Sequence, residues 1–185
     1  MPPSRRVLAA GALVLLLHTA AIAVYRDDAP GPLLSNICQL MLGLLVAHTS
    51  FHVARGSQAF SRAFWSLAGA AFAIWCAGQA LGTYYGTYLN LPTQGLWYVD
   101  ALYTAWPAPL VMCLFLDPTI EQTGWNAEWA LDCGQVGIVF VLVYIYFSSV
   151  ASNSAQLGTW LLSAATDGLL TLSFVLRALV ARKHP

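Results

Sequence analysis

The sequence predicts an all-α fold, a polytopic membrane helix bundle with about six transmembrane helices in a single domain. Composition is the first observation: 58% of the 185 residues are hydrophobic and 9% are charged, with a mean hydropathy of +0.65. Soluble domains carry about 25% charged residues. The second observation is that the apolar runs reach the roughly 20 residues that a helix needs to cross a bilayer. The third is that short polar segments separate these runs.

The apolar runs fill most of the chain. We expect the helices at residues 7–25, 33–54, 63–86, 97–116, 127–148 and 157–181. Polar backbone has to leave the hydrocarbon between spans. The segments from Arg26 to Pro32, from Arg55 to Gln58 and from Asn90 to Gly95 meet this need, as do residues 117–128 and 148–156. Connections this short predict no soluble domain.

The basic residues predict the orientation, because Lys and Arg resist translocation across the membrane. With the N-terminus in the cytoplasm, only Arg26 of the eight basic residues lies outside. The cytoplasmic ones are then Arg5, Arg6, Arg55, Arg62, Arg177, Arg182 and Lys183. Both termini are therefore expected in the cytoplasm, with the chain passing through the membrane several times.

The first apolar run has a second interpretation. Arg5 and Arg6, the apolar stretch and the small residues Ala21 to Ala23 together resemble a secretory signal peptide with its cleavage site. The stretch is long for the core of a signal peptide, and His18 within it is unusual for one. We therefore take it as the first membrane helix; cleavage of residues 1–23 would leave five spans.

Ionisable residues deep in a membrane are costly and are therefore candidate functional groups. Four fall inside the expected helices: His18, His48, Asp132 and Asp167. His52 and Asp100 lie nearer the boundaries. At about 1.5 Å per residue, His18 and Asp167 both come near the midplane. A His18–Asp167 pair would ease the burial of each group and could respond to pH, voltage or a ligand; alternatively, each bonds to a neighbouring hydroxyl or carbonyl.

Metal or haem binding has one weak indication. His48 and His52 are four residues apart, the spacing at which two imidazoles on one helix face can share a metal. No third ligand is placed by the sequence, and the four cysteines occur singly, without a C-x-x-C motif. Packing at the membrane interface and contact with lipid headgroups are the preferred explanation of the two histidines, so no cofactor is predicted.

The third expected helix carries a surface of small residues. Gly69, Gly78 and Gly82, with several alanines between them, allow another helix to approach closely, and Gln79 could bond across such a contact. The partner could be another helix of this chain, a second copy in a homodimer, or another membrane protein.

The fourth expected helix contains Pro107 and Pro109. These prolines remove two backbone donors and disfavour α geometry at Trp106 and Ala108. A kink or break is therefore expected. In a transporter such a break can line a substrate site, whereas in an ordinary bundle it is only a bend.

Several residues together resemble a known family of membrane regions. The matching positions are Arg62, Phe64, Trp65, Trp75, Gly78, Gln79, Tyr84, Tyr85, Asp100, Pro107, Pro109, Asp117, Pro118, Asp132 and Gln135. This pattern resembles the membrane-embedded N-terminal input regions of bacterial sensor histidine kinases, especially those of the acidobacterial type, and of related diguanylate cyclases. The chain departs from the pattern at Gly86, where the family often has Glu, and at residues 91–95.

The resemblance implies a sensory, signal-transducing input domain. In such families the kinase or cyclase module follows the membrane region in the cytoplasm, and this sequence contains neither a phosphate-binding glycine loop nor an acidic metal site in a soluble segment. We therefore expect no enzyme activity in the chain itself. A stimulus would shift the packing of the helices, and the last helix would pass the shift to a cytoplasmic effector kinase or cyclase.

Two other functions fit the same features. The chain could be an accessory subunit of a larger membrane complex, docked through the small-residue surface of the third helix. It could also be a small transporter, supported by Asp132, Asp167 and the proline break. The expected partners are the lipid bilayer and other membrane proteins; the net charge of zero gives no support to a nucleic-acid partner.

Overall fold

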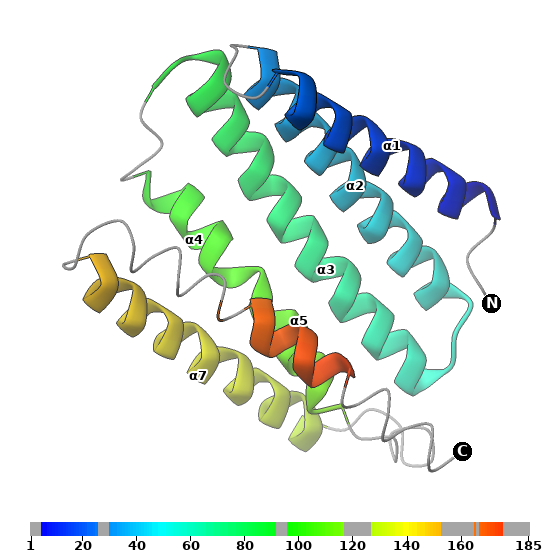
Figure 1. Ribbon diagram of the computed structural model, residues 1–185. Coiled ribbons are helices and arrows are strands. Elements are labelled where there is room, and N and C mark those ends of the chain that lie inside the picture. Colours follow the sequence, from blue (N-terminus) through cyan, green and yellow to red (C-terminus); the bar gives the residue numbers. More distant parts are fainter. Residues whose placement is uncertain are drawn as a thin grey trace.

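A computed structural model of the chain describes residues 5–25, 30–91, 96–116, 127–152, 165 and 167–175 (Figure 1). Within these residues every regular element is a helix and there is no strand, which confirms the all-α class. The elements are α1 (Arg5–Tyr25), α2 (Pro30–Arg55), α3 (Ala59–Gly82), the π-helix η1 (Thr83–Tyr88), α4 (Trp97–Ala105), α5 (Pro107–Leu114) and α7 (Ala127–Ser152). A further helical segment covers residues 167–175.

Three helical stretches are long and apolar enough to cross a bilayer. They are Val7–Tyr25, Pro30–Arg55 and Ala59–Tyr88, the last formed by α3 and η1 together. Three, rather than the expected six, meet both criteria within the described ranges. Large apolar side chains of α1, such as Leu16 and Val24, are about 70% exposed. In a membrane these side chains would face lipid tails without a free-energy penalty, because lipid tails are as apolar as leucine.

The helices lie side by side in chain order. Figure 1 shows α1 against α2, α2 against α3, and the α4–α5 pair between α3 and α7, and each of these pairs is in contact. α3 therefore touches more of the bundle than any other element and lies at its centre. The segment 167–175, drawn in orange and red, returns to this centre. Its Phe174 ring meets Phe64 of α3 edge to face at 6.2 Å.

Small residues bring α2 and α3 close together. A Cβ atom added at Gly43 of α2 would lie 2.6 Å from Cys76 Sγ and 2.8 Å from the Trp75 ring. A Cβ atom at Gly69 of α3 would lie 3.0 Å from the Phe51 ring of α2. Each helix thus accepts a large side chain of the other at a glycine, the close approach that small residues allow between membrane helices.

The third span changes its winding near its end. After Gly82 the chain continues as the π-helix η1, which the sequence analysis did not anticipate. Asn90 then adopts a left-handed conformation with φ of 52°, which Asn tolerates better than most residues. This turn lets the Leu91 amide donate to Tyr85 O at 2.9 Å, which satisfies a carbonyl at the helix end.

The fourth span is interrupted at Trp106, between α4 and α5. The helix divides at the position where a kink or break is expected, although Trp106 itself keeps α-type angles (φ −59°, ψ −33°). Its amide donates to Leu102 O at 3.1 Å and so continues the turn of α4. Pro107 and Pro109 both lie in the first turn of α5, where a missing N–H needs no partner. The two prolines therefore mark the start of α5 as a separate helix.

Replacement of Gly43 by alanine should destabilise the bundle. The new methyl group would overlap Cys76 and Trp75, and such overpacking costs about 1–3 kcal/mol in well-packed cores. Gly134→Ala is the matched control, since a Cβ atom at that helical glycine meets nothing within 4 Å. Denaturation of the detergent-solubilised chain, followed by circular dichroism, should show a loss of stability for Gly43→Ala alone. Equal stability of the two variants would contradict the close α2–α3 contact.

Candidate functional site

A hydrogen-bonded chain of polar side chains connects three helices. The Gln79 amide of α3 donates from Nε2 to Asn36 Oδ1 of α2 at 3.1 Å. Its Oε1 accepts from the Tyr103 hydroxyl of α4 at 2.8 Å. Gln79 is only 8% exposed, so an amide without these partners would be costly at this depth. Gln79 therefore ties α2, α3 and α4 together.

The π-helix extends this polar chain. Asn36 Nδ2 donates to Thr87 Oγ1 of η1 at 3.2 Å, and Thr83 Oγ1 donates to Gln79 O at 2.7 Å. A π-helix has about one more residue per turn than an α-helix, so side chains along η1 point in other directions than an α-helix would give them. Thr87 of η1 faces α2 at Asn36. π-Helical turns are frequent at functional positions, so this end of α3 is a candidate site.

Two glycines make room for Tyr103. A Cβ atom at Gly82 would lie 3.2 Å from the Tyr103 hydroxyl, and one at Gly78 would lie 3.3 Å from Leu102 Cβ. The small-residue surface of α3 thus receives α4 of the same chain at Gly78 and Gly82, and Phe51 of α2 at Gly69. The partner at these three positions is internal.

A cavity of about 670 Å³ lies among α2, α3, the α4–α5 pair and the segment 167–175. Most of its lining is apolar or aromatic, and Asp167, Gln39 and Thr171 supply the polar groups. The full lining is Gln39, Leu42, Gly43, Val46, Phe72, Trp75, Trp106, Leu110, Asp167, Leu170, Thr171, Phe174 and Val175. A largely apolar cavity of roughly 300–1,000 Å³ with few polar groups is typical of small-molecule sites. We refer to it below as the central cavity.

His18 lies on α1, which packs along α2. Its Nδ1 is buried without a hydrogen-bond partner. The structure contains neither a hydrogen bond nor an ion pair between His18 and Asp167, both of which it describes. The expected His18–Asp167 pair is therefore not formed, because Asp167 lines the central cavity instead.

The other two aspartates are exposed, as Asp167 is, but lie elsewhere in the bundle. Asp132 is exposed and lines a separate, mostly apolar cavity between α5 and α7 with Gln135 and Val111. Asp100 is also exposed and lies in the first turn of α4, where a negative charge is favourable. Neither residue joins Asp167 in the central cavity.

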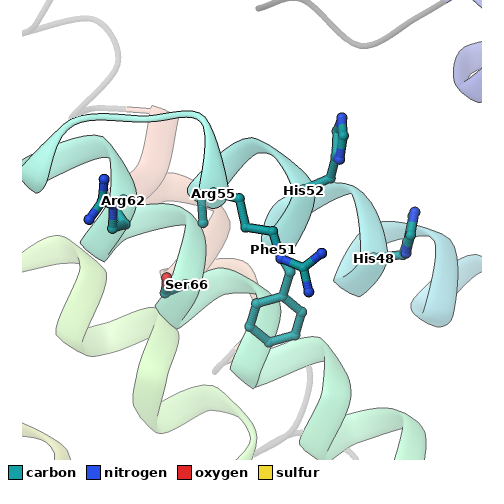
Figure 2. Close-up of a pocket in the computed structure, with 7 residues that line it drawn as sticks. His48, Phe51, His52, Arg55, Arg62 and Ser66 are labelled. Atoms are coloured by element: carbon teal, nitrogen blue, oxygen red, sulfur yellow. The ribbon is translucent and has the colours of Figure 1, made fainter.

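His48 and His52 stack on the outer side of α2. Their ring centroids are 6.4 Å apart with an interplanar angle of 10°. Figure 2 shows both imidazoles pointing the same way, away from Phe51. No group of three or more His, Cys, Asp or Glu side chains in the described part of the chain is arranged to hold a metal. Two arginines, Arg55 and Arg62, line the same pocket, and their positive charge opposes metal binding.

The residues of the family-like motif are spread over the bundle. Arg62 Nε and Nη2 donate to Ser57 O at 3.2 and 3.1 Å and so brace the turn between α2 and α3. Phe64 packs edge to face on Trp65, and Trp75 lines the central cavity. Tyr84 and Tyr85 lie on η1, where the Tyr84 ring stacks on Tyr88 and the Tyr85 ring contacts Tyr98. Asp117 and Pro118 lie outside the described residues.

Several residues of these two sites were not singled out from the sequence. Asn36, Thr87 and Tyr103 complete the polar chain around Gln79, and Gln39 and Phe72 line the central cavity. One signal could have found Asn36 and Gln39: amide side chains inside an apolar run need partners from neighbouring helices. Tyr103 carries no such signal, since tyrosine is common at membrane boundaries.

Removal of the Gln79–Tyr103 hydrogen bond should show coupling between α3 and α4. In a double-mutant cycle, Gln79→Leu and Tyr103→Phe should interact by about 0.6–1.7 kcal/mol, the range found for hydrogen bonds between membrane helices. Gln39→Leu is the control, because the Gln39 amide donates to Ser35 on its own helix at 3.2 Å. In denaturation of the solubilised protein, the loss of stability in the Gln39→Leu/Tyr103→Phe double variant should equal the sum of the losses in the two single variants. Additive effects in both cycles would contradict the role assigned to Gln79.

Comparisons of the chain with protein-family models, with curated proteins and with solved structures find no match.

Proposed function

We propose that the chain is a sensory input module of a bacterial inner membrane, with about six transmembrane helices and both termini in the cytoplasm. The all-α bundle, its three helices suited to cross a bilayer and the placement of the basic residues support this proposal. A cytoplasmic kinase or cyclase, joined to the chain or recruited by it, would receive the signal.

The central cavity carries the proposal. Its walls come from α2, α3 and the α4–α5 pair, and the segment 167–175 adds Asp167, Leu170, Thr171, Phe174 and Val175 to its lining. A molecule in this space contacts the last described helix directly. Occupancy is thereby coupled to the position of that helix.

The coupling follows from differential affinity. A ligand shifts the packing only if it binds one position of the segment 167–175 more tightly than another. The Asp167 carboxylate makes no hydrogen bond or ion pair with the other described residues, so it is available to a ligand that donates hydrogen bonds or carries positive charge. The aromatic rings of Trp75 and Trp106 supply apolar contact and favour a cation as well.

A small transporter is the second candidate. One observation favours it: Trp106, at the junction of α4 and α5, lines the same cavity as Asp167. Interrupted helices beside an intramembrane carboxylate are typical of substrate sites in transporters. The sensor is favoured because Trp106 retains helical backbone, whereas the substrate sites of transporters typically lie at unwound segments.

Filling the central cavity should change the signal. Thr171→Trp places a large ring in the cavity, whereas Leu172→Trp, the matched control, alters a neighbour on the same helix that does not line the cavity. Each variant is fused through Pro185 to a kinase reporter. Coupling energies between sites are typically about 1–3 kcal/mol, so the Thr171→Trp output should differ from that of the parent by about fivefold or more.

The two candidates give different results. The sensor requires a changed output from Thr171→Trp, a changed response from Asp167→Asn and an unchanged output from Leu172→Trp. A reporter that responds equally to both tryptophans, or to neither, would refute it. Solute flux through proteoliposomes containing the unfused chain, abolished by Asp167→Asn, would instead establish the transporter.

A further inference from the structure

An apolar groove of about 400 Å³ runs between α1 and α2. It is lined by residues within 7–15 of α1, by residues within 42–50 of α2 and by Trp65 of α3, and we call it the α1–α2 groove. Leu8, one of its α1 residues, is 60% exposed. The groove is therefore open to the surroundings of the bundle, which in a membrane are lipid tails.

The α1–α2 groove and the central cavity meet at two side chains. Leu42 and Val46, one turn apart on α2, line both hollows. Val46 is 39% exposed and Leu42 is half-buried, so both are accessible where the hollows meet. On α3, Trp65 of the groove and Phe72 of the cavity are separated by about two turns and share one face. The two hollows are thus successive parts of one surface along α2 and α3.

The polar groups of this joint surface differ between its two parts. Asp167 lies in the central cavity, and its carboxylate makes no hydrogen bond or ion pair with the other described residues. None of the described residues that line the cavity is basic. In the groove, Thr49 Oγ1 donates to Leu45 O of its own helix at 2.5 Å, and Ser50 is only 3% exposed. One part therefore offers an unbalanced negative charge and the other offers almost purely apolar contact.

The joint surface is long and narrow. Along α2 it extends over residues 39–50, about 16 Å of helix. An extended dodecyl chain has a similar length. A carboxylate without a cation is costly inside a membrane, so a positively charged group in the cavity would lower that cost. The aromatic rings of Trp75 and Trp106 favour the same charge.

From this shared border we infer that the central cavity and the α1–α2 groove form one site for a positively charged, single-chain amphiphile that enters from the bilayer. Its ammonium group lies beside Asp167, and its alkyl tail passes over Leu42 and Val46 into the groove. The tail gains little on leaving lipid, because lipid tails are equally apolar, so the charge supplies most of the affinity. This inference rests on the proposed function, since it names the ligand class of the central cavity.

The test uses dodecylamine with a photoreactive diazirine near its methyl end, added to the full chain in phosphatidylcholine nanodiscs. Mass spectrometry should locate cross-links within residues 7–15 that unlabelled dodecylamine prevents. Because hydrogen bonds to charged groups are strong, Asp167→Asn should weaken this protection about tenfold or more. Asp132→Asn, the matched control, removes the same charge from the separate cavity between α5 and α7 and should change nothing. Equal protection in Asp167→Asn and the parent, or equal protection by neutral dodecanol, would overturn the inference.

A second pair of variants tests the border between the two hollows without touching the carboxylate. Val46→Trp places a large ring where the tail would pass. Leu44→Trp, the matched control, changes a residue of α2 that is 52% exposed and lines neither hollow. Both positions are exposed, so both variants should fold. Cross-links within residues 7–15 should be lost in Val46→Trp and kept in Leu44→Trp; equal labelling of the two would overturn the continuous site.

The labelling is measured without a reporter, so its outcome can be separated from that of the sensory function. Protected cross-links confined to the central cavity would overturn the groove as part of the site and leave the sensor in place. Protected cross-links in the groove, together with a reporter that does not respond to Thr171→Trp, would support the amphiphile site and refute the sensor.

Discussion

Side chains of neighbouring helices lie directly against the backbone at glycines of α2 and α3. Trp75 and Cys76 face Gly43, Phe51 faces Gly69, and Tyr103 lies over Gly82. Lipid tails are as apolar as leucine, so the hydrophobic effect does little to hold membrane helices together, and close van der Waals contact has to do it. The position of α3 between α2 and α4, and thus the shape of the bundle, depends on these contacts.

The polar chain around Gln79 depends on that same close approach. An amide inside an apolar bundle needs partners for both its donor and its acceptor. Asn36 and Tyr103 supply them only because α2 and α4 both come within hydrogen-bonding distance of α3. The π-helix then adds Thr87 to the chain by turning this side chain toward α2. Packing and hydrogen bonding therefore support each other at this end of the bundle.

The two cavities use different parts of α2 and α3. Gln39 and Gly43, near the middle of α2, line the central cavity, and Arg55 at the end of α2 lines the basic pocket with His48 and His52. The central cavity is mostly apolar with a single carboxylate, which suits a small ligand at depth. The basic pocket carries Arg55 and Arg62 and lies where α2 ends and α3 begins.

The sequence by itself determined the all-α class, because a bilayer requires long apolar runs and satisfied backbone donors, and both requirements are local properties of the chain. It also indicated the positions where small residues and prolines matter, and the expected break at Pro107 and Pro109 corresponds to the start of α5. Tertiary structure alone decided that Asp167 lines a cavity with Gln39 and makes no pair with His18. It also decided that Gln79 bonds to Asn36 and Tyr103. Depth in the membrane can be counted along one helix, but which side chains meet depends on the rotation and neighbours of several helices at once, and no single segment carries that information.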